Sequence, residues 1–276
     1  MTQNNRNLFQ SINKDILKGF KRIYWFNYLK FKKIYLNLKS NKINKHNISI
    51  LYPTRERSVK FNRMLNSLII NCNDPSRINI MLLLDTDEPE LDKYKEVISD
   101  KLYKDLNFQI HIKDLKNHAI RNNYLANISK DMILFPVNDD IIFKSKDWDK
   151  YIDEEFSKID ISKPYCIWTD TGQKYPYLHS DFPILNKAWY ERLGYLSSEI
   201  FNHWYFDTWI CDLSVRSKKF HLSSDIKIYQ YSAHSIKEEV DSTHLRITKN
   251  DNASKDKIIW EESLQIRIND ATKLIN

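Results

Sequence analysis

Two adjacent carboxylates, Asp139 and Asp140, directly follow a short apolar run in this chain of 276 residues. The run, residues 132–137, has the length and composition of a strand that is buried on both faces of a parallel sheet. Two charges at the end of such a strand are costly unless water, a metal ion or a cationic ligand meets them. Ligands of open α/β sheets bind outside the carboxyl ends of the strands. We therefore predict a metal-assisted site here, against the alternative of a turn that merely ends the strand.

Alternating strands and helices should position this pair. The periodicity predicts four strands, over residues 47–53, 78–84, 108–112 and 132–137. The helices between them are expected over residues 59–70, 91–103 and 117–128. This order predicts an α/β fold with a mostly parallel sheet and right-handed crossovers.

Three further elements are expected in the second half of the chain. They are an amphipathic helix over residues 204–220, a strand over 226–231 and a final helix over 255–276. The apolar residues of the final helix should face inward and make it part of the scaffold. They are Ile258, Ile259, Leu264, Ile266 and Ile268.

The chain has only three glycines, Gly19, Gly172 and Gly194, so a Gly-x-Gly-x-x-Gly loop is impossible. The lack of this loop argues against a dehydrogenase of the usual Rossmann kind and against a P-loop NTPase. If a nucleotide binds, another group must neutralise its phosphates. A divalent cation on Asp139 and Asp140, assisted by a basic side chain, would do so.

The positive charge is concentrated at the N-terminus. Residues 1–46 hold eleven Lys or Arg and one acid, Asp15, although the whole chain has a net charge of only +7. We expect a basic, aromatic, helical arm. Its longest uncharged run, residues 23–29, is far shorter than the roughly 20 residues that span a bilayer.

The arm has more than one possible partner. It could lie in the interface of an anionic membrane, or pack on the body or on another subunit with its lysines solvated. Nucleic acid is not expected as a partner because no recognised module accompanies the basic residues. Three scattered cysteines, Cys72, Cys166 and Cys211, and the lack of a secretory signal predict a cytoplasmic protein. An arm bound to lipid would place it at the inner face of the cytoplasmic membrane.

Several short motifs, taken in order, resemble the landmarks of GT-A-fold glycosyltransferases of the family-2-like kind. They are the strand ending in Pro53-Thr54, Leu83-Leu84-Asp85, Arg121-Asn122, Val137-Asn138-Asp139-Asp140, and the segments 182–194 and 206–216. The resemblance covers residues 48–234. It implies a Rossmann-like, mostly parallel central sheet flanked by helices. With the arm over 1–46, it implies a catalytic domain over 47–250 and a C-terminal helix, 251–276, packed on that domain.

The resemblance also implies a reaction. It is a metal-dependent, inverting transfer of a sugar from a nucleotide-diphosphate sugar to a hydroxyl of a glycan or lipid-linked glycan, with Mn²⁺ or Mg²⁺ as cofactor. The alternatives are a nucleotidyltransferase on a related fold, which usually needs a Gly-rich loop that residues 54–58 lack, and a non-catalytic scaffold that docks on a membrane. The oligomeric state stays open.

Residue roles follow from the matched motifs. Asp140 is expected to bind the metal, Asp139 to bind the metal or the ribose, and His234 to be a further metal ligand. Asp207 is expected to be the general base, although it could instead cap its helix. The remaining expected contacts to the nucleotide sugar are Pro53, Thr54, Arg55, Asp85 and Arg121.

Overall fold

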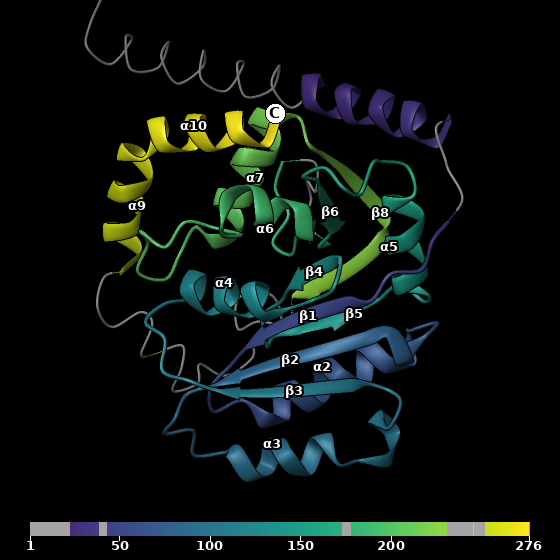
Figure 1. Ribbon diagram of the computed structural model, residues 1–276, viewed down its shortest axis with the longest axis vertical. Helices are drawn as coiled ribbons and strands as arrows, with labels where there is room; N and C mark the ends of the chain where they lie inside the picture. The colour runs from purple at the N-terminus through teal and green to yellow at the C-terminus, as the bar shows by residue number, and fades with distance from the viewer. Residues whose placement is uncertain (1–22, 39–42, 173–177, 231–244, 246–251, 276) are drawn as a thin grey trace, which may run out of the picture.

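The structure is a computed structural model that describes residues 23–38, 43–172, 178–230, 245 and 252–275. Eight described strands form one curled sheet with the order β3-β2-β1-β4-β7-β6-β8-β5 (Figure 1). The strands are β1 (Ile48–Pro53), β2 (Ile78–Leu84), β3 (Asn107–Ile112), β4 (Ile133–Pro136), β5 (Ile141–Phe143), β6 (Cys166–Asp170), β7 (Ile184–Asn186) and β8 (Phe220–Gln230).

The sheet is mostly parallel, as predicted. β1 pairs in parallel with both β2 and β4, β2 with β3, and β6 with β8. The short β7 runs antiparallel to β4 and β6, and β5 runs antiparallel to β8. The first four strands therefore end at a common edge.

Helices cover both faces of the sheet. They are α2 (Ser58–Ile70), α3 (Leu91–Ile98), α4 (His118–Ile128), α5 (Trp148–Phe156), α6 (Lys187–Leu193), α7 (Phe206–Ser217), α9 (Asn252–Glu262) and α10 (Leu264–Ile275). In Figure 1, α2 and α3 lie on one face of the β1–β3 part, and α4, α6 and α7 lie on the other. Residues 23–38 form a further helix. Within the described residues, no helix has both the length and the apolar character needed to cross a bilayer.

The apolar strands are buried on both sides because their side chains alternate between two cores. In β1, Ile50 and Tyr52 join the core beneath α2 and α3, whereas Leu51 joins the core beneath α4 and α7. β2 divides in the same way, with Leu82 in the first core and Leu83 in the second. This division explains why the sequences of these strands are uninterrupted apolar runs.

Some predicted boundaries were wrong. The helix expected over 91–103 ends at Ile98, and Asp100 begins a separate 3-10 turn, Lys101–Tyr103, by accepting a hydrogen bond from the Leu102 amide. The strand expected over 226–231 begins at Phe220. Strands β5, β6 and β7 were not predicted, because they have only three to five residues each.

The inward face of the final helix was also predicted wrongly. The segment forms two helices, α9 and α10, and four of the residues expected inside are exposed, namely Ile258, Leu264, Ile266 and Ile268. Only Ile259 packs against the core. The buried side contains Arg267 instead, which lies 3.2 Å from Asp212 of α7 and stacks 3.6 Å from the centre of the Trp260 ring. Arg267 thus occupies an inner position, beside the buried Ala271 and Leu274, because α7 supplies its acidic partner.

A buried ion-pair network joins the amino ends of the first strands to α5. Arg77, 6% exposed, donates to Asp149 at 3.0 Å and to Asp153 at 3.0 Å, and also to the His46 carbonyl at 2.6 Å. Asp149 in turn accepts from the Asn73 amide at 2.7 Å. Every member of this network therefore has a partner.

Replacing Arg77 by Met should lower the free energy of unfolding by about 3–5 kcal/mol, because two buried carboxylates would lose their cation. Urea denaturation measures the loss. Lys95→Met is the control: its ion pair with Asp92 is exposed, so its removal should cost less than about 1 kcal/mol. Similar losses in both variants would contradict the structural importance of the buried network.

Candidate functional site

The carboxyl ends of β1, β2 and β4 bring predicted site residues to one edge. Pro53 is opposite Leu83 in the β1–β2 register. The Thr54 amide donates to the Leu83 carbonyl at 3.1 Å, and the Val137 amide donates to the Leu51 carbonyl at 3.1 Å. The residues that follow these strands, among them Asp85 and the acidic pair, therefore lie along the same edge.

Asp139 is fully engaged by neighbouring side chains. Its Oδ1 accepts from Arg57 Nη1 at 2.6 Å, and its Oδ2 accepts from Thr54 Oγ1 at 3.0 Å. Arg57 lies in the same turn after β1 as Thr54 and Arg55. Both oxygens of Asp139 are thus used within the protein, and its contact with metal or ribose stays a prediction.

Asp140 is held on one side only. Gln230 Nε2, at the end of β8, donates to its Oδ2 at 3.0 Å. Its Oδ1 is buried, and the described part of the chain offers that atom no hydrogen-bond partner. Burial, and then the neighbouring charge of Asp139, raise the pKa of Asp140. A hard cation would give this buried carboxylate oxygen the partner that it lacks.

The predicted ligand His234 lies outside the described residues, so its role stays a prediction. It follows Gln230, the partner of Asp140, by four positions in the sequence.

The two predicted arginines meet at Asp85. Arg121, from the first turn of α4, donates to one oxygen of Asp85, and Arg55 Nη1 donates to the other at 3.2 Å. Arg55 also forms an ion pair with Asp87. One ion-pair cluster at the ends of β1 and β2 therefore contains three residues that were predicted to contact the nucleotide, namely Arg55, Asp85 and Arg121.

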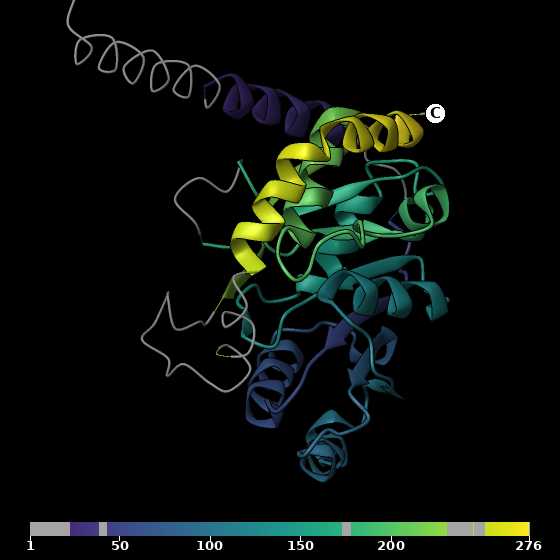
Figure 2. The same ribbon diagram turned by 90° about the vertical axis from the view of Figure 1, so that its left-hand side faces the viewer.

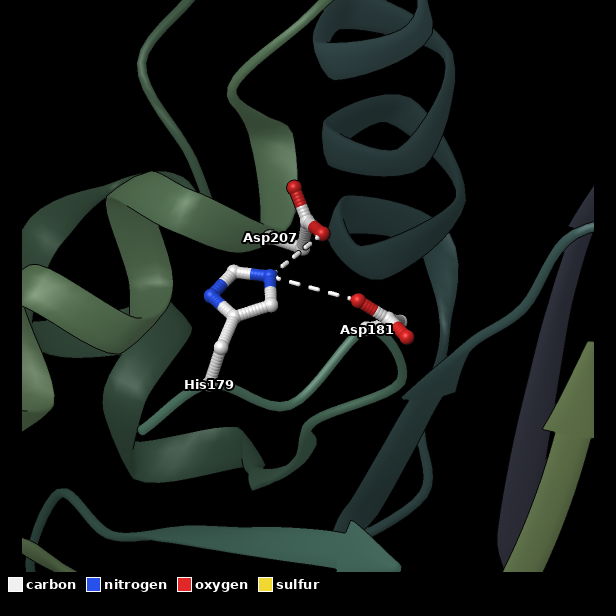
Figure 3. A group of neighbouring side chains, drawn as sticks. All are labelled: His179, Asp181 and Asp207. Atoms are coloured by element: carbon white, nitrogen blue, oxygen red, sulfur yellow. Dashed lines mark hydrogen bonds and ion pairs between the residues drawn. The ribbon is translucent and has the colours of Figure 1, made fainter. Parts of the chain in front are cut away.

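The predicted base, Asp207, has a partner that was not predicted from the sequence. Figure 3 shows the His179 ring with its Nε2 directed at two carboxylates, 2.8 Å from Asp207 Oδ2 and 3.4 Å from Asp181 Oδ1. The other oxygen of Asp207 accepts from the Thr208 amide at 2.8 Å. His179 and Asp181 lie in a segment without helical or strand periodicity, which gave no signal of their role.

His179 and Asp207 change each other's charge state. Burial alone would raise the pKa of Asp207, but the hydrogen bond from His179 and its charge lower that pKa below its ordinary value. Burial alone would lower the pKa of His179, but Asp207 raises it above its ordinary value. The pair is therefore an imidazolium and a carboxylate at neutral pH.

The same three side chains form a second candidate metal site. One ligand atom from each of His179, Asp181 and Asp207 lies within 4.8 Å of the other two. A metal would need the lone pair of His179 Nε2, whereas the ion pair needs a proton on that atom. Metal and ion pair therefore exclude each other at this cluster.

The turn before α7 is anchored by the C-terminal helices. Asp256 of α9, fully buried, accepts hydrogen bonds from the backbone amides of Asn202, His203 and Trp204 at 2.7, 2.9 and 2.8 Å. The chain then enters α7 through Tyr205 in the left-handed region, with φ of 68°. α9 thus holds the backbone that presents Asp207.

α4 connects this turn to the strand ends. Asn117 caps α4 by accepting from the Ile120 amide at 2.8 Å, and its amide nitrogen donates to the Phe201 carbonyl at 2.7 Å. The ring of His118 packs edge-on against Phe206, with 4.9 Å between the ring centres. The first turn of α4 therefore touches both the Asp85 cluster, through Arg121, and the start of α7.

Solved structures with the same fold are known. Mannosyltransferase PcManGT from Pyrobaculum calidifontis, in complex with GDP-Man and Mn²⁺, matches with a TM-score of 0.55 at 10% identity, over 93% of this chain and 83% of that one. S. aureus TarS 1-349 in complex with UDP-GlcNAc matches with a TM-score of 0.52 at 13% identity, over 73% of this chain and 64% of that one. This chain thus spans less than two thirds of the TarS chain.

No protein-family model matches the sequence, and no curated protein matches it either. At identities this low the likeness concerns the fold. The predicted fold class is confirmed: the chain has the GT-A type of glycosyltransferase fold.

Proposed function

We propose that this protein is a metal-dependent glycosyltransferase. It would move a sugar from a nucleotide-diphosphate sugar to a hydroxyl of a glycan or lipid-linked glycan. The observation that carries the proposal is the buried Asp140 Oδ1, which has no partner in the described part of the chain and lies beside Asp139 at the ligand-binding edge of a GT-A-type sheet. PcManGT, which has this fold, was solved with GDP-Man and Mn²⁺.

The charges at this edge support a cation. The three arginines there, Arg55, Arg57 and Arg121, are all paired with carboxylates. Asp140 adds a further acid, which accepts its hydrogen bond from the neutral amide of Gln230. A diphosphate approaching this edge would be repelled unless a cation came with it.

The cation fits on Asp140, with Asp139 and His234 as the further predicted ligands. When bound, it would neutralise the negative charge that gathers on the leaving diphosphate. Of the expected donor contacts, Pro53 and Thr54 lie at the end of β1, and Asp85 would accept a hydrogen bond from the nucleotide base. Arg55 and Arg121 hold Asp85 in place.

Asp207 would take the proton of the acceptor hydroxyl. As that proton moves to the carboxylate, the acceptor oxygen bonds to the anomeric carbon, and the bond from that carbon to the diphosphate breaks. Attack from the face opposite the diphosphate inverts the anomeric centre. His179 keeps Asp207 ionised and oriented for this step.

The acceptor side has one exposed aromatic residue close to the base. Trp204, three positions before Asp207, is 41% exposed, and its ring offers an apolar face on which a sugar could stack. Tyr205 instead stacks on Trp260 with 5.2 Å between ring centres, so it belongs to the packing of α9. This supports a saccharide as the acceptor.

The first prediction concerns the metal. Mn²⁺ together with the correct nucleoside diphosphate should stabilise the protein against heat, by about 2.7 kcal/mol at a ligand concentration of about 100 Kd. Asp140→Asn should abolish this stabilisation, whereas the matched variant His179→Gln should keep it. Thermal melts with UDP and GDP, with and without Mn²⁺, measure both.

Two outcomes would contradict this assignment. Stabilisation by a nucleoside diphosphate without any divalent cation would remove the metal from donor binding. Loss of the Mn²⁺ effect in His179→Gln, with Asp140→Asn unchanged, would move the metal to the cluster of His179, Asp181 and Asp207.

The second prediction concerns the base. Asp207→Asn should slow turnover of the stabilising nucleotide sugar by about 10²–10⁴-fold, without weakening donor binding, because the carboxylate acts on the acceptor. Asp92→Asn, at a fully solvated carboxylate, is the control. Steady-state kinetics with the donor varied separates the two effects, and unchanged turnover in Asp207→Asn would reject the role.

The third prediction follows from the lowered pKa of Asp207. His179→Gln removes the group that lowers this pKa, so the pKa of Asp207 should rise. The acidic limb of kcat/KM, which reports protonation of the base in the free enzyme, should therefore move to higher pH. An acidic limb that stays in place would show that His179 does not set the charge of Asp207.

A further inference from the structure

The helix over residues 23–38 has two apolar faces. Its inner face packs on the body through Leu29 and Leu36, which are 7% and 6% exposed, and through Trp25 against Phe220. Lys32 lies on this inner side and donates to the Lys218 carbonyl at 2.8 Å. The helix is therefore docked on the body and does not need its outer face to stay there.

The outer face of this helix is also apolar. At 100° per residue the large exposed apolar side chains of this helix, Phe26 and Tyr35 aside, fall within an arc of about 100°. These residues are each between 52% and 83% exposed, and they are Ile23, Tyr24, Phe31, Ile34 and Leu38. We call this set the outer stripe. Contiguous apolar surfaces of this kind on soluble proteins mark interaction sites.

Basic residues accompany the outer stripe. Lys30 and Lys33 lie along one edge of it, on the same helix, and Lys33 reaches Asp225 at 3.6 Å. The segment 1–46 as a whole holds eleven Lys or Arg and one acid. The partner of the outer stripe should therefore combine an apolar interior with negative charge.

A hollow of about 710 Å³ lies next to the end of this helix. The helix lines it with Tyr35, Leu36 and Leu38. The charged residues of the body that line it are Asp160, Lys158, Lys163 and Lys219, and Lys158 is paired with Glu155 at 2.6 Å. Lys163, with 68% of its side chain exposed, is available to an anion even though Asp160 lies 3.7 Å away. An apolar wall facing lysines suits an amphiphile with an acidic head group.

More apolar surface lies at the same end of the molecule. Figures 1 and 2 both show α10 beside the helix of residues 23–38 at this end. Leu264, Ile268 and Ile275 of α10 share one side of that helix and are 39–53% exposed. Exposed apolar side chains at this end of the molecule are therefore not confined to one helix.

We propose that this end of the protein docks on an anionic lipid membrane, with the helix of residues 23–38 lying in the plane of the interface and the outer stripe directed into the lipid. A second copy of the chain fits this surface less well, because pairing two outer stripes would bring two strongly basic segments together. Lipid supplies both the apolar interior and the negative head groups. The inference does not depend on the proposed reaction.

Vesicle flotation of the full chain tests the proposal. The protein should float with phosphatidylcholine vesicles that contain about a third phosphatidylglycerol, and bind vesicles of phosphatidylcholine alone much more weakly. Phe31→Ser with Ile34→Ser should weaken binding by at least about tenfold, because two large apolar side chains leave the buried face.

The matched control is Ile70→Ser with Ile112→Ser. These residues are 72% and 50% exposed, close to the 71% and 52% of Phe31 and Ile34, but they lie on α2 and β3. The control should bind vesicles as the wild type does. Thermal melts should show both variants folded, since all four side chains are largely solvated.

Three outcomes would overturn the proposal. They are no flotation of the wild type with anionic vesicles, equal loss in both double variants, and a dimer in light scattering that is lost only in Phe31→Ser with Ile34→Ser. The last result would identify a second copy of the chain as the partner of the outer stripe.

Discussion

The parallel pairing of β1 with β2 and β4 is the constraint on which the site depends. Parallel strands end at the same edge, so the residues that follow them must converge whatever their distance in sequence. The hydrogen bonds from Thr54 to β2 and from Val137 to β1 extend this alignment one residue past the strands. The strands themselves are buried on both faces. The polar groups that follow them therefore lie beyond the strand ends, where the sheet no longer excludes water.

Several carboxylates converge at this edge, and the structure balances their negative charges in two ways. Asp85 and Asp139 receive guanidinium groups from loops and from α4, which uses the arginines that could otherwise have met phosphate. Within the described residues, Asp140 accepts a hydrogen bond from the neutral amide of Gln230, and the charge of Arg57 lowers its pKa less than burial and Asp139 raise it. The same division separates the paired acids from the one acid that we propose as the metal ligand. Asp207, the proposed base, is balanced by His179.

Local pattern was sufficient for strands β1 to β4 and for the position of the residues that follow them. Strands β1 and β2 are apolar runs with a polar residue at the end, and the acids after β4 interrupt apolar sequence on both sides, so their burial and position follow from composition. Partners that come from distant or irregular segments could not be predicted. His179 and Asp181 belong to no periodic element, and the pairing of Arg57 with Asp139 depends on the conformation of the four-residue turn, residues 54–57, between β1 and α2. The inner face of α10 was misread because pattern analysis assumes apolar residues inside, whereas Arg267 has an acid on α7 as its partner.

The anchoring of the turn before α7 by Asp256 has a consequence for how the protein is made. Residues 202–204 have their amides capped by a side chain that leaves the ribosome more than fifty residues later. Strands β1 to β4 and α4 can assemble as soon as the first half of the chain is available, since domains fold from the N-terminus during synthesis. Until α9 has been synthesised and docked, these amides lack this acceptor. A nascent or prematurely ended chain would thus have strands β1 to β4 but no anchor for the turn that precedes Asp207, the base that we propose.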